Sequence, residues 1–167
     1  MRRWIVFVIG LWLVPAVASA QKVYVDSDPS ASFAAYRTYG WTAGTPSSNP
    51  LADNRIHAAV DQQMAAKGFM AAANPDVFVA THVITHDQKE LVATGFGPGW
   101  GFGGYGTASV ETYVQGTLVV DLYDAQTKKL VWRAKATETV SDKPEKNTAK
   151  INKALAKMFE QYPPRQK

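Results

Sequence analysis

Cysteine is absent from this chain of 167 residues. Its absence excludes disulfides, thiol nucleophiles, thiolate metal ligands and redox-active cysteine pairs. It also excludes the N-terminal cysteine through which bacterial lipoproteins receive their lipid. Any catalysis or metal binding would therefore depend on histidine, carboxylate or hydroxyl groups.

Long apolar runs are scarce, and the one present lies at the N-terminus. Met1-Arg2-Arg3-Trp4 is followed by an apolar run from Ile5 to Val17 and then by Ala18-Ser19-Ala20. A positive start, a short apolar stretch and a small-x-small site are typical of a cleaved secretory signal peptide. A membrane anchor would need roughly 20 apolar residues. We therefore predict a signal peptide over residues 1–20 and a soluble protein that is periplasmic or secreted.

No strong charge of either sign remains after this cleavage. Lys and Arg fall from 18 to 16 with the loss of Arg2 and Arg3, against 14 Asp and Glu, which leaves a net charge of +2. This balance and the compartment make nucleic acid an unsuitable partner. The remaining 147 residues (167 − 20) form one domain, residues 21–167, large enough to fold without disulfides.

The local patterns predict the order β-β-α-β-β-β-α. Strands are expected at 23–25, within 33–41, from 77 to about 86, over 109–123 and from 129 to about 140. Helices are expected from Pro50 to Gly68, with Asn49 as N-cap, and from about 144 to 160. This order favours an α+β two-layer sandwich, with a mostly antiparallel sheet and both helices packed on one face. A Gly/aromatic-rich loop is expected at about 87–108.

Alternation in the last two strands indicates their buried faces. Leu118, Val120 and Leu122 share one face of their strand. Across the pair they are expected to meet the residues Leu130, Trp132, Ala134 and Ala136.

Several short motifs occur in a recognisable order along the whole mature chain. They are Asp26, Asp28-Pro29, Phe33, Tyr36, Thr38-Tyr39, Trp41, Arg55-Ile56, Ala66-Lys67-Gly68-Phe69, Pro75-Asp76-Val77, Gly116 to Asp121, Lys129 to Arg133 and Pro163-Pro164. With these motifs the chain resembles the bacterial envelope family called domain of unknown function 4136. The resemblance implies an exported protein with a two-layer α/β sandwich, and it supplies no catalytic residue. Many such proteins are lipoproteins, whereas here Gln21 follows the predicted cleavage site.

The glycine-rich segment 95–106 is the first candidate for a functional site. Its glycines precede a strand instead of opening a helix, so a phosphate-binding loop is excluded. Four aromatic residues in it are candidate binding residues: Phe96, Trp100, Phe102 and Tyr105. Exposed aromatic rings stack on sugars or dock on proteins. The alternative is a loop whose aromatic rings fold back onto the sheet.

Polar candidates elsewhere favour structural roles. His82 and His86 would lie ~13 Å apart on one strand, too far to share a metal ion. Asp121 lies opposite the apolar face of its strand, and an ion pair with Arg133 on the solvent face is expected. We therefore expect no catalytic residue, no metal site and no cofactor.

These patterns favour a non-enzymatic periplasmic binding or envelope-assembly module. Its partner would be an envelope protein or a cell-wall glycan. The alternative is an envelope hydrolase or small-ligand carrier whose pocket lies between the sheet and the loop.

Overall fold

A computed structural model describes residues 22–94 and 107–164 of the chain. Its elements follow the order β1 (Lys22–Ser27), a 3-10 turn η1 (Phe33–Ala35), β2 (Thr38–Trp41), α1 (Pro50–Ala66), β3 (Met70–Ala71), β4 (Val77–Thr94), β5 (Thr107–Asp124), β6 (Leu130–Thr139) and α2 (Pro144–Glu160). The expected order is confirmed, with the two-residue β3 as an addition. The predicted signal peptide, residues 1–20, lies outside the described residues.

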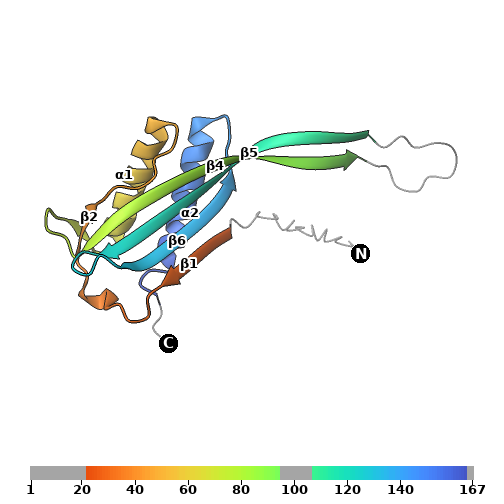
Figure 1. The fold of residues 1–167 in the computed structure, drawn as a ribbon. Coiled ribbons are helices and arrows are strands. Elements are labelled where there is room, and N and C mark those ends of the chain that lie inside the picture. Colours follow the sequence, from red (N-terminus) through yellow and green to blue (C-terminus); the bar gives the residue numbers. More distant parts are fainter. Residues whose placement is uncertain (1–21, 95–106, 165–167) are drawn as a thin grey trace, which may run out of the picture.

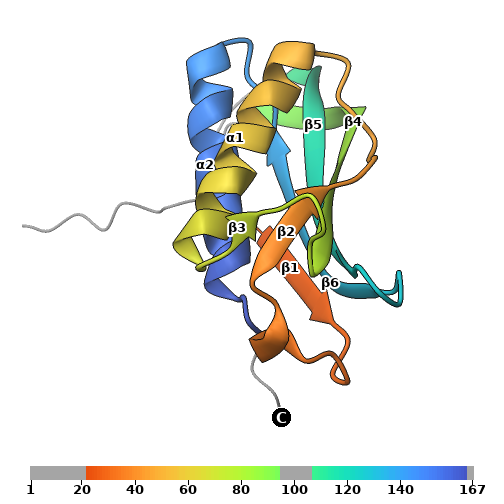
Figure 2. The ribbon, with the colours of Figure 1, turned by 90° about the vertical axis from the view of Figure 1, so that its left-hand side faces the viewer.

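The strands form one six-stranded sheet in the order β1-β6-β5-β4-β2-β3. β2 is parallel to β3 and to β4, and the other neighbours are antiparallel. Both helices lie on one face of this sheet (Figures 1 and 2). The predicted α+β sandwich with a mostly antiparallel sheet is thus confirmed. None of the helices in the described part of the chain is long and apolar enough to cross a membrane.

The first helix begins and ends where its local sequence indicates. The Asn49 side chain accepts a hydrogen bond from the Leu51 N–H at 3.0 Å, and Pro50 opens the helix. Gly68 takes a φ of 84°, a left-handed conformation that suits glycine, and ends the helix. Phe69 then folds back, donating its N–H to the Met64 carbonyl at 3.0 Å.

The core lies between the helices and the sheet. Trp132 of β6 is fully buried and packs at 5.3 Å, centroid to centroid, against Phe159 of α2. The other large side chains that are fully buried on this side are Val60, Met64, Val77, Val79, Val120, Leu122, Leu155 and Met158. Burial of these apolar groups provides the main driving force for the fold.

The expected facing pairs of β5 and β6 are confirmed at three positions and wrong at one. Leu118, Val120 and Leu122 lie opposite Ala136, Ala134 and Trp132. Leu130 instead lies opposite Tyr123 and is 37% exposed, because the register shifts between Leu122 and Tyr123. The shift adds one residue to β6, so the side chain of Val131 becomes buried in place of Leu130.

The loop expected at about 87–108 is wrong at both of its ends, where residues 87–94 and 107–108 belong to strands. β4 continues to Thr94 and β5 begins at Thr107, paired from Asp87↔Val114 to Thr94↔Thr107. The residues of β5 that pair with this part of β4 are rich in Val, Thr and Tyr and stabilise the extended conformation. The sequence of β4 alone does not predict a strand here, because it carries several charged residues. This two-stranded extension, residues 87–94 and 107–114, stands clear of the body in Figure 1 and is called the arm below.

Candidate functional site

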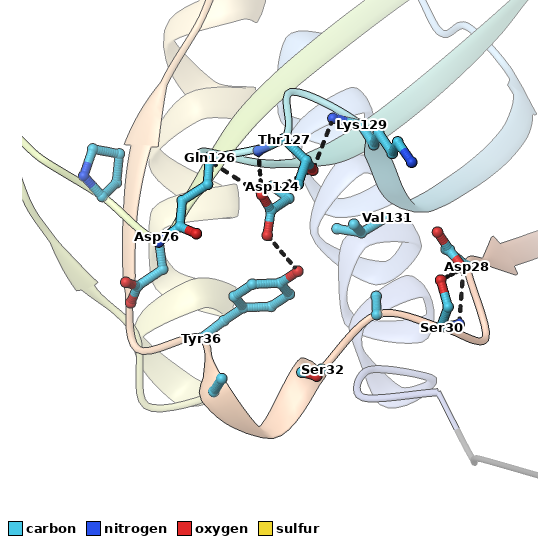
Figure 3. A pocket seen from close by; sticks show the side chains of 13 residues that line it. Asp28, Ser30, Ser32, Tyr36, Asp76, Asp124, Gln126, Thr127, Lys129 and Val131 are labelled. Atoms are coloured by element: carbon cyan, nitrogen blue, oxygen red, sulfur yellow. Dashed lines mark hydrogen bonds between the residues drawn. The ribbon is translucent and has the colours of Figure 1, made fainter.

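A polar cavity of about 400 Å³ lies at the end of the domain opposite the arm. Four segments line it: the turn after β1, η1 with the residue that follows it, the chain entering β4, and the β5–β6 loop. Three aspartates from different segments, Asp28, Asp76 and Asp124, line it together with Tyr36 (Figure 3). We call this cavity the carboxylate pocket.

Asp124 ends β5 and holds the β5–β6 loop closed. Its Oδ1 accepts hydrogen bonds from the N–H groups of Gln126 and Thr127 at 3.0 and 2.7 Å and from the Thr127 hydroxyl at 2.9 Å. Its Oδ2 accepts one from the Tyr36 hydroxyl at 2.9 Å. These bonds lower the pKa of Asp124, and the bond from the Thr127 N–H has the largest effect. Burial, followed by the bond to Asp124, raises the pKa of Tyr36 to about 12.

Asp76 precedes β4 and ties it to β2. Its Oδ2 accepts hydrogen bonds from the Arg37 N–H, the Thr38 N–H and the Thr38 hydroxyl, each at 2.9 Å. The bond from the Arg37 N–H is the largest cause that lowers the pKa of Asp76. Asp76 is therefore ionised at neutral pH.

Asp28 follows the same principle in the turn after β1. Its Oδ1 accepts hydrogen bonds from the hydroxyl and the N–H of Ser30 at 2.6 and 2.8 Å, a local bonding pattern that aspartate commonly forms in turns. These bonds lower the pKa of Asp28, and the bond from the Ser30 hydroxyl has the largest effect. In Asp28 and Asp76 these contacts all use one carboxylate oxygen, so the other oxygen remains an acceptor.

The pocket therefore presents hydrogen-bond acceptors and negative charge. Lys129 is the single cationic residue that lines it among the described residues. The described part of the chain holds no group of three or more His, Asp or Glu side chains arranged to bind a metal ion. A ligand that supplies hydroxyl or ammonium donors matches these carboxylates.

A second polar cluster lies on the sheet face that the helices leave uncovered. Arg133 donates from Nε and Nη2 to the two oxygens of Asp121 at 2.7 and 2.6 Å, which confirms the expected ion pair. The Tyr123 hydroxyl lies 3.2 Å and His82 Nε2 lies 3.4 Å from Asp121 Oδ2. Asp121 is completely buried among these neighbours, whereas a solvent-exposed pair was expected. Both oxygens of Asp121 accept hydrogen bonds within this cluster, and Asp121 lines neither the carboxylate pocket nor the second cavity described below.

A smaller, mostly apolar cavity of about 210 Å³ opens between the two helices and the sheet near the base of the arm. Ile56 of α1, Ile151 of α2 and Leu118 of β5 form its walls. Gly116 forms part of its floor, where a Cβ atom would lie 3.0 Å from Val140 Cγ2.

The residues predicted from sequence and those found in the pocket are different sets. Phe96, Trp100, Phe102 and Tyr105 lie outside the described residues, so their binding role stays a prediction. The sequence-based reasoning missed the carboxylate pocket, although six of the residues that line it belong to the motifs that carry the family resemblance: Asp28, Tyr36, Pro75, Asp76, Lys129 and Val131. Aspartate at successive strand ends was the signal available.

The fold and pocket define a class, a two-layer α+β domain with a polar recess at the ends of its strands. The sequence matches the model of DUF4136, a domain of unknown function, over residues 23–164. The chain belongs to this family, as its motifs indicated. No curated protein matches the sequence.

Solved structures share the fold at low sequence identity. A PDZ domain protein from Parabacteroides distasonis matches with a TM-score of 0.58 and 16% identity over 88% of this chain, but only 36% of that protein is covered. Two PelC dodecamers from Paraburkholderia phytofirmans match with TM-scores of 0.53 and 0.52 and identities of 15% and 14%. Each of these two matches covers 84% of this chain and 95% of PelC. At such identities the likeness shows the fold alone.

Proposed function

We propose that this chain is a non-enzymatic binding module of the cell envelope, and that the carboxylate pocket holds its ligand. The observation that carries the proposal is that three carboxylates from different segments, Asp28, Asp76 and Asp124, line one pocket together with the aromatic ring of Tyr36. A hydroxyl-rich glycan of the cell wall fits this chemistry, because sugar hydroxyls donate hydrogen bonds to carboxylates and sugar rings pack against aromatic rings. The envelope location rests on the predicted signal peptide and on family membership.

The charge state of the pocket favours binding over hydrolysis. A pair of carboxylates that acts as general acid and general base needs pKa values pushed in opposite directions. Here hydrogen bonds lower the pKa values of all three aspartates. None of the three is held in the protonated form that a general acid requires.

Calorimetric titration with soluble cell-wall glycan fragments tests this function. We expect the wild type to bind and Gln126→Ala to bind more weakly, because the Gln126 side chain lines the pocket while only its backbone N–H bonds Asp124. Asp26→Asn is the matched control, since Asp26 is exposed and lies outside the pocket lining. Absence of binding to the wild type, or equal binding by Gln126→Ala, would contradict the proposed site.

A role in envelope assembly is the second candidate, and the likeness to the PelC dodecamers favours it. Because PelC of the same fold assembles with copies of itself, self-association is the form of assembly to test. Light scattering of the purified protein across a concentration series measures it directly.

The aromatic segment remains the proposed contact to an envelope partner. A photo-crosslinking residue at position 100 in living cells, with the captured partner identified by mass spectrometry, tests this role of Trp100. Capture of one envelope protein or of glycan would support it, and no capture would contradict it.

A further inference from the structure

Among the described residues, the two strands of the arm pair only with each other along residues 87–94 and 107–113. β6 joins β5 from Gln115 onward, and one hydrogen bond from Val140 reaches Val114. The arm extends about 25 Å at ~3.3 Å per residue. An isolated two-stranded ribbon is marginally stable in water, and a third strand or a packed face is needed for independent stability. A partner strand would supply it.

The backbone groups of β5 show which residues are free to pair along its outer edge. The Val140 N–H donates to the Val114 carbonyl at 2.8 Å, so the backbone groups of Val114 face away from β4. Alternation places the N–H and C=O of Val110 and Thr112 on this same outer edge. In the described residues no strand accepts or donates there beyond Val114.

The two edges of the arm differ in charge. The β4 side carries Asp87, Lys89 and Glu90, and such charges discourage pairing with another chain. From 107 to 114 the β5 side carries one charge, Glu111, among Thr, Ser, Ala, Val and Tyr residues that favour strands. Only the β5 edge is therefore suited to receive a further strand.

We propose that the β5 edges of two copies of this chain pair antiparallel about a two-fold axis, with Val110 opposite its counterpart. This deepens the assembly role proposed above and names the surface it uses. The two arms then form a four-stranded sheet in the order β4-β5-β5-β4. The same patch serves both copies, as a two-fold interface requires.

The register follows from three constraints. A strand that pairs with its own copy must place an outward-facing residue opposite another outward-facing one, so opposed residues are separated by an even number of positions in the sequence, never an odd number. Centring on Glu111 would set two carboxylates directly opposite each other, which is destabilising. Centring on Thr112 would bring residue 108 against Gly116, where β6 already pairs with β5.

Centring on Val110 satisfies all three constraints. It pairs residues 107–113 and sets Glu111 opposite Ser109 of the other copy. Val110 then exchanges two backbone hydrogen bonds with its counterpart. Its side chain, 58% exposed in the single chain, meets the same side chain across the axis. This removes apolar surface from water on both copies.

The absence of cysteine gives a clean test by disulfide formation. We expect Val110→Cys to form a covalent dimer on mild oxidation, because opposed residues in an antiparallel pair lie about 5.5 Å apart. Leu91→Cys is the matched control, since Leu91 is paired with Val110 in the same row but on the other strand. We expect the Leu91→Cys variant to run as a monomer on non-reducing denaturing gels.

Proline substitutions test the same edge without a covalent bond. Val110→Pro removes an outward N–H from β5, whereas Leu91→Pro removes one from the opposite edge of the same row. By light scattering, Val110→Pro should lose self-association and Leu91→Pro should retain it. A wild type that self-associates equally with Val110→Pro would keep the assembly role but overturn pairing through the arm. A monomeric wild type, or equal crosslinking by the two cysteine variants, would also overturn it.

Discussion

The buried ion pair between Asp121 and Arg133 allows a prediction of unequal costs. Asp121 is 0% exposed, whereas the Arg133 side chain is 46% exposed. Arg133→Ala leaves a carboxylate buried without its main partner, while Asp121→Asn leaves a guanidinium that water already reaches. Removing one partner of a buried pair costs about 3–5 kcal/mol. We therefore expect Arg133→Ala to destabilise the fold more than Asp121→Asn does.

The magnitude follows from the contacts that remain. In Arg133→Ala, the Tyr123 hydroxyl and His82 still lie beside the carboxylate, so the cost falls at the lower end, about 3 kcal/mol. In Asp121→Asn the amide oxygen still accepts from one Arg133 donor, but the amide NH2 replaces the second acceptor oxygen. One hydrogen bond to the guanidinium is therefore lost, at a cost of about 1.5 kcal/mol. At roughly 4 °C per kcal/mol, thermal midpoints should fall by about 12 and 6 °C.

Thermal unfolding of both single variants and of the double variant measures these values. The double variant should be more stable than the sum of the single losses predicts, because it contains no buried carboxylate. A larger loss in Asp121→Asn than in Arg133→Ala would refute the reasoning. So would simple additivity in the double variant.

Three further predictions concern other positions. Gly44→Ala should lower the thermal midpoint more than Gly68→Ala, because a Cβ atom at position 44 would collide with the Thr81 carbonyl oxygen, whereas nothing lies within 4 Å of a Cβ atom at position 68. Gly68→Ala should cost only about 1 kcal/mol of stability, because Ala is less stable at the positive φ of position 68. Equal losses of thermal midpoint in the two variants would contradict the predicted collision at position 44. The lowered pKa of Asp76 contributes stability that is present above its ordinary pKa and lost as pH falls through the lowered value. Asp76→Asn should therefore flatten the fall in thermal midpoint below about pH 4 relative to the wild type. Asp61→Ala should cost about 2 kcal/mol in urea unfolding, because two donors, a tyrosine hydroxyl and an indole N–H at 2.8 and 2.9 Å, lose their acceptor; no shift in the midpoint would contradict this.

Local sequence was sufficient for elements whose causes lie within one turn or one strand. Asn49 and Gly68 mark the ends of α1 because capping depends on neighbours a few residues away. The alternation of Leu118, Val120 and Leu122 predicted the buried face of β5, because side chains of a strand alternate between its two faces. The two-layer fold follows from the order of such elements.

Local sequence failed where a second strand decides the outcome. Residues 87–90 were expected in the glycine-rich loop, yet they continue β4 because β5 supplies cross-strand partners. Leu130 was placed on the buried face, and one additional residue in β6 turned it away. The sequence of one strand alone predicts neither its pairing with a second strand nor the position of a β-bulge.

The sequence by itself determined the absence of thiol chemistry, the helix ends, the α+β class and the family. Only the tertiary structure decided where the carboxylate pocket lies. Tyr36 and Asp124 are 88 positions apart, and their hydrogen bond exists because β2 and β5 both pair with β4. The tertiary structure also decided that Asp121 is buried, because residues from the adjacent strands cover it. Chain contacts over such separations depend on how the sheet assembles, and no local pattern encodes that.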